Sequence, residues 1–192
     1  MSSQPKKILS PEEYLALERA SDHRSEFLNG EVFAMAGASP RHALIVSNLV
    51  RELSLGLRDR PCAVFASDLR LRVTPTGLYT YPDVMVACGD LKFADDHHDT
   101  LLNPSLVVEV LSPSTQDWDR GGKFAHYRTL DSVSDYLLVY QDRPHVELFA
   151  RQGEGQWLFS ELDRGDDAVK LRSLGLSLEL AEIYAKVELL PP

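Results

Sequence analysis

The sequence has no long apolar segment, and it has few cysteines. None of its apolar runs approaches the roughly 20 residues that a membrane-spanning helix requires. Residues 1–7 are polar and lack the apolar core of a secretory signal. These absences argue against a membrane or exported protein and predict a cytoplasmic one.

Only two cysteines are present, Cys62 and Cys88, and their spacing matches no metal-binding motif. We therefore expect both to be buried free thiols, which suits the reducing cytoplasm.

Basic residues are also scarce. The chain has 20 Lys and Arg against 29 Asp and Glu, a formal net charge of -9. Proteins that bind nucleic acids usually present a basic surface, because most of their affinity comes from phosphate contacts. A nucleic-acid-binding role here requires a local positive surface, for which the candidates are Arg41, Arg51, Arg58 and Arg60.

The rest of the composition is that of an ordinary globular protein. The 192 residues are 44% hydrophobic and 26% charged, which suits one domain over residues 1–192 with a sizeable core. Residues 1–9 are expected to form a flexible tail.

The N-terminal half mixes helix and strand signals. Ser10-Pro11-Glu12-Glu13 predicts a helix start and a helix to about residue 20. Asn29-Gly30 predicts a two-residue hairpin turn, and Ser39-Pro40 predicts a second helix with an apolar stripe. Residues 89–104 are polar and predict a surface loop.

The C-terminal half is rich in strands. Residues 136–140, 146–150 and 157–162 predict a meander that extends a sheet. The resulting fold class is α+β (mixed α/β), with a central mixed sheet flanked by helices. An exposed edge of the meander would suit a homodimer.

Glu109 is an unusual residue for its position. It lies in the apolar run Leu-Val-Val-Glu-Val-Leu of residues 106–111, which predicts a buried strand. A buried carboxylate costs several kcal/mol unless cations or hydrogen-bond donors meet it. A salt-bridged or edge-facing glutamate is the simpler interpretation, but Asp83 opens a second apolar strand segment. Two such carboxylates are typical ligands of Mg²⁺.

Three further residues are candidates for the same site. Lys123 follows Gly121-Gly122 in a predicted helix that Ser114 and Asp117 would cap, and it shares a helix face with Tyr127. Lys123 either stabilises charge at the site or is exposed to solvent.

Asp68 either forms a local turn or approaches Asp83 as a further metal ligand. His42 either packs in the core or contacts a metal-bound water or a phosphate. Glu26 and Glu31, beside the hairpin turn, either face the site or are solvated, and solvation is the commoner outcome for polar hairpin residues.

Several of these residues follow the order of a known family pattern. The matching segments are Pro82-Asp83, Glu109-Val110-Leu111-Ser112-Pro113-Ser114-Thr115, Asp117, Lys123 and Tyr127. This pattern resembles the Uma2 family of restriction endonucleases, which belongs to the PD-(D/E)XK nuclease superfamily. Gly30-Glu31 and His42 fit the N-terminal part of the family pattern. The resemblance covers roughly residues 10–161.

The resemblance implies a restriction-endonuclease-like fold and Mg²⁺-dependent hydrolysis of DNA, with Mn²⁺ as a substitute. Asp83 and Glu109 would hold the metal with help from Asp68, and Lys123 and His42 would assist catalysis. The superfamily motif has a lysine two residues after the acidic residue, where this sequence has Leu111. The resemblance implies that Lys123 replaces it.

Two other functions remain compatible with the sequence. One is a nuclease fold that has lost cleavage and serves as a binding or dimerisation module. The other is a phosphatase or another small-molecule hydrolase that uses the same carboxylates.

Overall fold

The computed structural model describes residues 8–35, 37–153, 155–164 and 167–189. The tail expected at residues 1–9 falls mostly outside these ranges. No helix in the described ranges is both long enough and apolar enough to cross a membrane.

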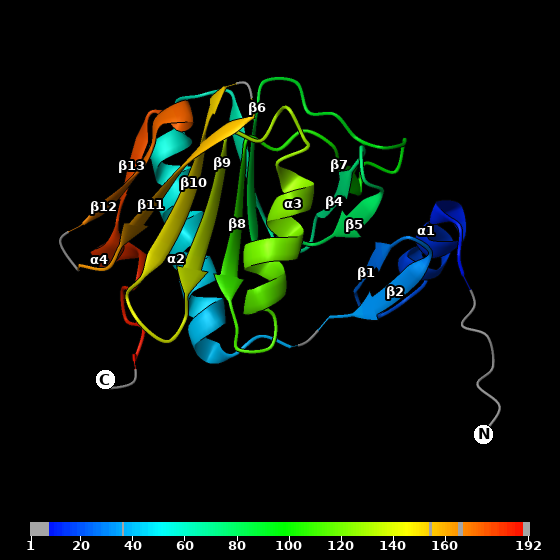
Figure 1. The fold of residues 1–192 in the computed structure, drawn as a ribbon, viewed down its shortest axis with the longest axis horizontal. Helices are drawn as coiled ribbons and strands as arrows, with labels where there is room; N and C mark the ends of the chain where they lie inside the picture. The colour runs from blue at the N-terminus through cyan, green and yellow to red at the C-terminus, as the bar shows by residue number, and fades with distance from the viewer. Residues whose placement is uncertain (1–7, 36, 154, 165–166, 190–192) are drawn as a thin grey trace.

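The fold is α+β, as the sequence predicts (Figure 1). The helical elements are α1 (Pro11–Arg19), α2 (Pro40–Leu57), the π-helical segment η1 (Trp118–Lys123), α3 (Phe124–Tyr127), the 3-10 turn η2 (Arg172–Leu174) and α4 (Leu180–Ile183). The strands are β1 (Ser25–Leu28), β2 (Glu31–Ala34), β3 (Cys62–Ala66), β4 (Arg70–Val73), β5 (Leu78–Thr80), β6 (Val84–Cys88), β7 (Thr100–Leu101), β8 (Leu106–Leu111), β9 (Asp135–Tyr140), β10 (Val146–Gly153), β11 (Gln156–Leu162), β12 (Ala168–Leu171) and β13 (Leu176–Glu179).

A six-stranded mixed sheet forms the centre, in the order β11-β10-β9-β8-β6-β3. Strands β8 and β9 run parallel, and the other neighbours are antiparallel. The predicted meander is confirmed as β9, β10 and β11. The buried strand predicted around Glu109 is also confirmed, because all six residues of β8 are buried.

Helix α2 covers one face of this sheet, and η1 and α3 lie against the other (Figure 1). The apolar stripe of α2, which includes Ile45 and Leu49, packs on Val108 and Val110 of β8. Side chains alternate across a strand, so Val107 and Leu111 point to the opposite face, where Tyr127 packs with them. The same alternation sends Glu109 toward η1 and α3.

A second sheet extends from the η1 side, with strand order β2-β1-β5-β4-β7. The β1–β2 hairpin and α1 form its outer part (Figure 1). Asn29 and Gly30 have positive φ values of 51° and 86°, which the tight hairpin turn requires. The predicted loop at 89–104 contains the short strand β7, which pairs parallel with β4.

The predicted helix starts are confirmed. Ser10 accepts a hydrogen bond from the backbone of Glu13, and the Glu13 side chain accepts one from the Ser10 backbone, which completes a capping box. Ser39 caps α2 by accepting a hydrogen bond from the backbone N–H of His42. This cap fixes His42 in the first turn of α2.

The prediction of two free thiols is wrong. Cys62 and Cys88 are bonded to each other. They are directly paired residues of the antiparallel strands β3 and β6, a register that the sequence spacing does not reveal. The cysteines therefore no longer support a reducing compartment.

An ion-pair cluster joins α1 to the loop before β7. Arg19 Nε lies 2.7 Å from Asp99 Oδ2, and an Arg19 Nη2 atom lies 2.7 Å from Asp95 Oδ2. The hydrogen bonds from Arg19 hold the pKa of Asp99 down at about 2. Asp99 therefore stabilises the fold above its unfolded pKa of roughly 3.9. That contribution is lost as the pH falls through about 2.

We predict that Asp99→Asn lowers the free energy of unfolding at pH 7 by about 1 kcal/mol, a value discounted for solvent screening. The difference from wild type should shrink below about pH 4 and vanish near pH 2, as urea unfolding at a series of pH values would show. Asp96→Asn is the control, because Asp96 is exposed. Equal losses at pH 7 and pH 2 would contradict the electrostatic origin.

Candidate functional site

Glu109 lies at the centre of a buried polar cluster. Its side chain accepts a 2.7 Å hydrogen bond from the Tyr127 hydroxyl and a 3.2 Å hydrogen bond from Lys123 Nζ, both on Oε1. Burial raises the pKa of Glu109 well above its usual value, although the Lys123 charge opposes the shift. Lys123 and Tyr127 share one helical face, as predicted from their spacing.

Asp83 lies beside Glu109 across two paired strands. Val84 of β6 pairs with Val108 of β8 in antiparallel register, so the residues before and after this pair are neighbours. The Asp83 side chain accepts a 2.8 Å hydrogen bond from the Val110 backbone on Oδ2. Strand register therefore brings together the two carboxylates that the sequence places far apart.

His42 joins the cluster from the first turn of α2. Its Nε2 lies 3.2 Å from Asp83 Oδ2. Burial lowers the pKa of His42, but the hydrogen bond and charge of Asp83 outweigh burial and leave the pKa raised. His42 therefore contacts a carboxylate of the cluster, and its contact with a metal-bound water or a phosphate stays a prediction.

Lys123 is surrounded by carboxylates. Its Nζ lies 3.2 Å from Glu26, 3.2 Å from Glu109 and 3.0 Å from Asp119, and its side chain is only 8% exposed. Burial alone lowers the pKa of Lys123, but the three carboxylates raise it well above the usual value. The lysine is therefore a buried ammonium and not a solvated helix residue.

The start of the helix that carries Lys123 differs from its prediction. Ser114 Oγ lies 3.0 Å from Ser112 Oγ, and no hydrogen bond joins Ser114 to Asp117 among the described residues, so the expected capping box is not formed. Instead, η1 spans residues 118–123, and regular α-helix begins at Phe124. The backbone carbonyl of Asp119 accepts a 2.8 Å hydrogen bond from the Tyr136 hydroxyl, which holds η1 against β9.

Two residues of this cluster are not among the site residues predicted from the sequence. Solvation is the favoured expectation for Glu26, yet it faces the site, where it contacts Lys123 and accepts a 2.5 Å hydrogen bond from Thr80. Asp119 is the second such residue. The i,i+4 spacing of Asp119 to Lys123 is the sequence signal that could have predicted their contact. No local sequence feature identifies Glu26 as a site residue, because β1 reaches the site only through its pairing with β5.

Asp68 does not belong to the cluster. Residues 67 and 68 form a turn between β3 and β4. The Asp68 side chain is 82% exposed and pairs with Arg24. Its interpretation as a metal ligand is therefore corrected, because the turn directs the carboxylate to solvent.

A cleft of about 770 Å³ opens onto the carboxylates. Its lining includes Asp83, Glu109 and Lys123, together with residues of the 112–115 turn. The cleft is accessible to solvent.

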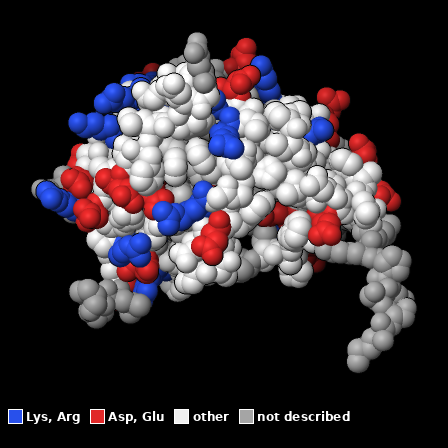
Figure 2. Space-filling model, viewed as in Figure 1, with Lys and Arg blue, Asp and Glu red and all other residues white. Residues whose placement is uncertain are grey.

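Three of the four proposed basic residues, Arg51, Arg58 and Arg60, are engaged by other groups of the protein. Arg51 pairs with Glu52 and Glu182, and Arg58 pairs with Asp59. Arg60 donates to backbone carbonyls of residues 174 and 175. On the face shown in Figure 2, basic and acidic side chains are interspersed and form no continuous basic band among the described residues.

The sequence matches the model of the family Uma2, described as "Putative restriction endonuclease", over residues 11–181. The chain belongs to the Uma2 family. It is 42% identical to the uncharacterized protein sll1609 of Synechocystis sp. over 81% of this chain and 88% of that protein. It is 37% identical to a second Synechocystis protein, slr1290, over 95% and 94% of the two chains.

The fold resembles a solved structure. The crystal structure of a putative nuclease of the DUF820 group from Anabaena variabilis superposes with a TM-score of 0.73, at 19% identity, over 92% of this chain and 98% of that one. Family and fold together indicate a restriction-endonuclease-like nuclease, a class of hydrolase that generally uses divalent cations.

The cluster fits a divalent cation on two grounds. Glu26, Asp83, Glu109 and Asp119 face a single lysine ammonium and one histidine, so negative charge is in excess. The hydrogen bonds of Asp83 fall on Oδ2 and those of Glu109 fall on Oε1. The other oxygen of each carboxylate is therefore the candidate ligand, because hard cations prefer carboxylate oxygens.

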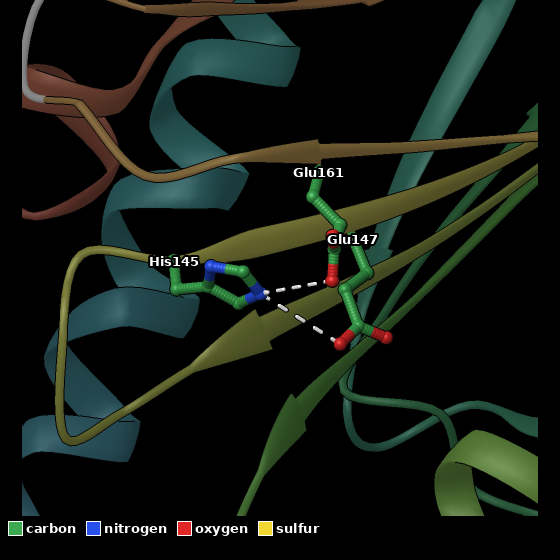
Figure 3. Close-up of side chains that lie close together, drawn as sticks. All are labelled: His145, Glu147 and Glu161. Atoms are coloured by element: carbon green, nitrogen blue, oxygen red, sulfur yellow. Dashed lines mark ion pairs between the residues drawn. The ribbon is translucent and has the colours of Figure 1, made fainter.

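A second group with metal-binding residue types lies at the β10–β11 end (Figure 3). His145 Nε2 lies 3.7 Å from Glu147 and 3.9 Å from Glu161, and the three ligand atoms fall within 4.8 Å of one another. However, the buried Glu147 carboxylate already binds Arg120 at 2.8 Å and the Tyr140 hydroxyl at 2.8 Å. Arg120 belongs to η1, so this pair anchors the segment that carries Lys123.

We predict that Lys123→Met lowers the free energy of unfolding by about 3–5 kcal/mol, because it leaves buried carboxylates without a counter-ion. Glu109→Gln in the same background should recover part of that loss, which a double-mutant cycle by urea unfolding measures.

Lys170→Met is the matched control, because Lys170 is exposed, and it should change stability by less than about 0.5 kcal/mol. A loss below about 1 kcal/mol for Lys123→Met, typical of surface pairs, would contradict a buried ammonium.

Proposed function

We propose that this protein is a metal-dependent endonuclease that hydrolyses phosphodiester bonds of DNA. The observation that carries the proposal is the pairing of Asp83 and Glu109 on neighbouring strands, with Lys123 in contact with Glu109 and an open cleft in front. The match to the Uma2 family supports the reaction class.

In this proposal Asp83 and Glu109 hold Mg²⁺, which Mn²⁺ can replace. The bound cation supplies a water of lowered pKa and neutralises charge on the scissile phosphate. The Val110 N–H and His42 fix Asp83 by holding its Oδ2. The Tyr127 hydroxyl fixes Glu109 in the same way.

Lys123 takes the role of the lysine that the superfamily motif places at position 111. Its ammonium lies 3.2 Å from the Glu109 carboxylate, so it sits beside a proposed ligand of the cation, where its positive charge can stabilise negative charge that develops in the reaction. Glu26 and Asp119 keep it charged by raising its pKa. This assignment makes Glu26 and Asp119 positioning residues.

The cytoplasm is the proposed location, because a DNA substrate lies there. The Cys62–Cys88 bond does not support this part of the proposal, since disulfides persist mainly in oxidising compartments.

Calorimetric titration with Mg²⁺ and Mn²⁺, paired with nicking of supercoiled DNA, tests the metal site. Asp83→Ala and Glu109→Ala should each abolish metal binding and reduce the nicking rate by about 100-fold or more. Chelation of the metal by EDTA should stop nicking by the wild type.

Asp68→Ala is the matched control, because Asp68 is an exposed aspartate in the turn after β3, the strand that pairs with β6. It should keep wild-type metal affinity and nicking. Metal binding without nicking by the wild type would favour the non-cleaving binding module. Unchanged metal binding in both site variants would show that Asp83 and Glu109 are not the metal ligands.

We further propose a homodimer formed by the edge strand β11. This strand is the last of the six-stranded sheet, and its Leu158 and Phe159 side chains are 48% and 44% exposed. An edge strand with exposed apolar residues is a template for pairing with a second copy.

Sedimentation velocity should give a dimer for the wild type and a monomer for Leu158→Lys, because a charge on an edge strand opposes pairing. Leu17→Lys on α1, where Leu17 is 57% exposed, should remain a dimer. A wild-type monomer at all concentrations would contradict this assembly.

A further inference from the structure

An apolar pocket adjoins the carboxylate cleft. It has a volume of about 290 Å³ and is lined by Glu26, Leu28, Phe33, Leu78 and Trp118. Glu26 and Trp118 also line the carboxylate cleft, so the two cavities share these side chains as a common wall. The pocket is at the small end of ligand-binding cavities, which suits one flat heterocycle.

Two aromatic side chains form the accessible walls of this pocket. Phe33 on β2 is 46% exposed, and Trp118 at the start of η1 is 37% exposed. Large aromatic groups left accessible beside a charged cleft offer faces on which a planar ring can stack.

The position of Trp118 is fixed by its own helix. A Cβ atom at Gly122 would overlap the indole ring, so only glycine allows the ring to lie against the next helical turn. The ring also meets His126 edge-on at 5.8 Å. Trp118 directly precedes Asp119, which holds Lys123. The aromatic wall and the lysine therefore belong to the same segment, η1.

The cleft has little unpaired positive charge with which to bind phosphates. Arg24 and Lys123 line it, but Arg24 pairs with Asp68, and Lys123 is held by three carboxylates. The affinity that most nucleic-acid-binding proteins draw from phosphates is thus reduced. Base stacking is worth about 1–3 kcal/mol per base and does not depend on protein charge.

We propose that this pocket binds the base of an unpaired nucleotide next to the scissile phosphate, between Trp118 and Phe33. This inference rests on the proposed nuclease function and adds its substrate class, which is single-stranded DNA or an unpaired segment of a duplex. A base inside a duplex cannot enter a side pocket without leaving the stack. Stacking tolerates all four bases, so little sequence preference is expected.

Tryptophan fluorescence tests the pocket without requiring cleavage. The sequence has two tryptophans, so Trp157→Phe leaves Trp118 as the single reporter. Titration in EDTA with a single-stranded oligonucleotide should quench its emission in a saturable way. A blunt duplex of the same length should bind at least about 10-fold more weakly.

Variants separate stacking from folding. Trp118→Leu and Phe33→Leu should each weaken binding of a fluorescein-labelled single strand, measured by anisotropy, by about 5- to 100-fold. Trp118→Phe should retain most of the affinity because it keeps an aromatic face. Leu91→Ala is the control, because Leu91 is 38% exposed and lies outside both cavities.

Equal affinity for single strand and duplex, or unchanged affinity in Phe33→Leu and Trp118→Leu, would overturn the inference. The metal site is tested separately. Single-strand binding that persists in Asp83→Ala, together with a wild type that does not cleave, would sustain the base pocket and reject the nuclease function.

Discussion

The structure depends on the burial of one ammonium group among carboxylates. Lys123 Nζ lies within 3.2 Å of Glu26, Glu109 and Asp119. Each partner comes from a different element, so the ion pairs join the β1–β2 hairpin, the central strand β8 and the π-helical segment η1. Buried charges are stable only when all partners are in place. The site and the packing of these three elements therefore require each other.

The arrangement also accounts for the departure from the superfamily motif. Leu111 lies on the same face of β8 as Glu109, where a lysine would normally stand, and it packs in the apolar cluster beneath α3. The ammonium instead arrives from η1, which Arg120 anchors to Glu147 on β10. A lysine can thus occupy the same region of space from a different element, because tertiary contacts hold the helix in place.

The acidic character of the protein limits how it can bind nucleic acid. Several of its arginines are engaged by neighbouring carboxylates or carbonyls, and the cleft itself carries excess negative charge. Divalent cations and aromatic surfaces are two means of binding DNA that do not need a basic face. The carboxylate cleft and the apolar pocket share Glu26 and Trp118 in their linings, so both means would lie side by side.

Features that depend on near neighbours in the chain could be predicted from the sequence. Helix caps, the Asn29-Gly30 turn, the C-terminal meander and the burial of Glu109 follow from local backbone preferences and apolar periodicity. Tertiary structure alone decided the features that depend on strand register and on the packing of distant segments. Register paired Cys62 with Cys88, and packing brought Glu26 to Lys123 while a turn sent Asp68 to solvent. The physical reason is that a carboxylate on a short strand has the same local sequence signal whether it faces water or a buried cation.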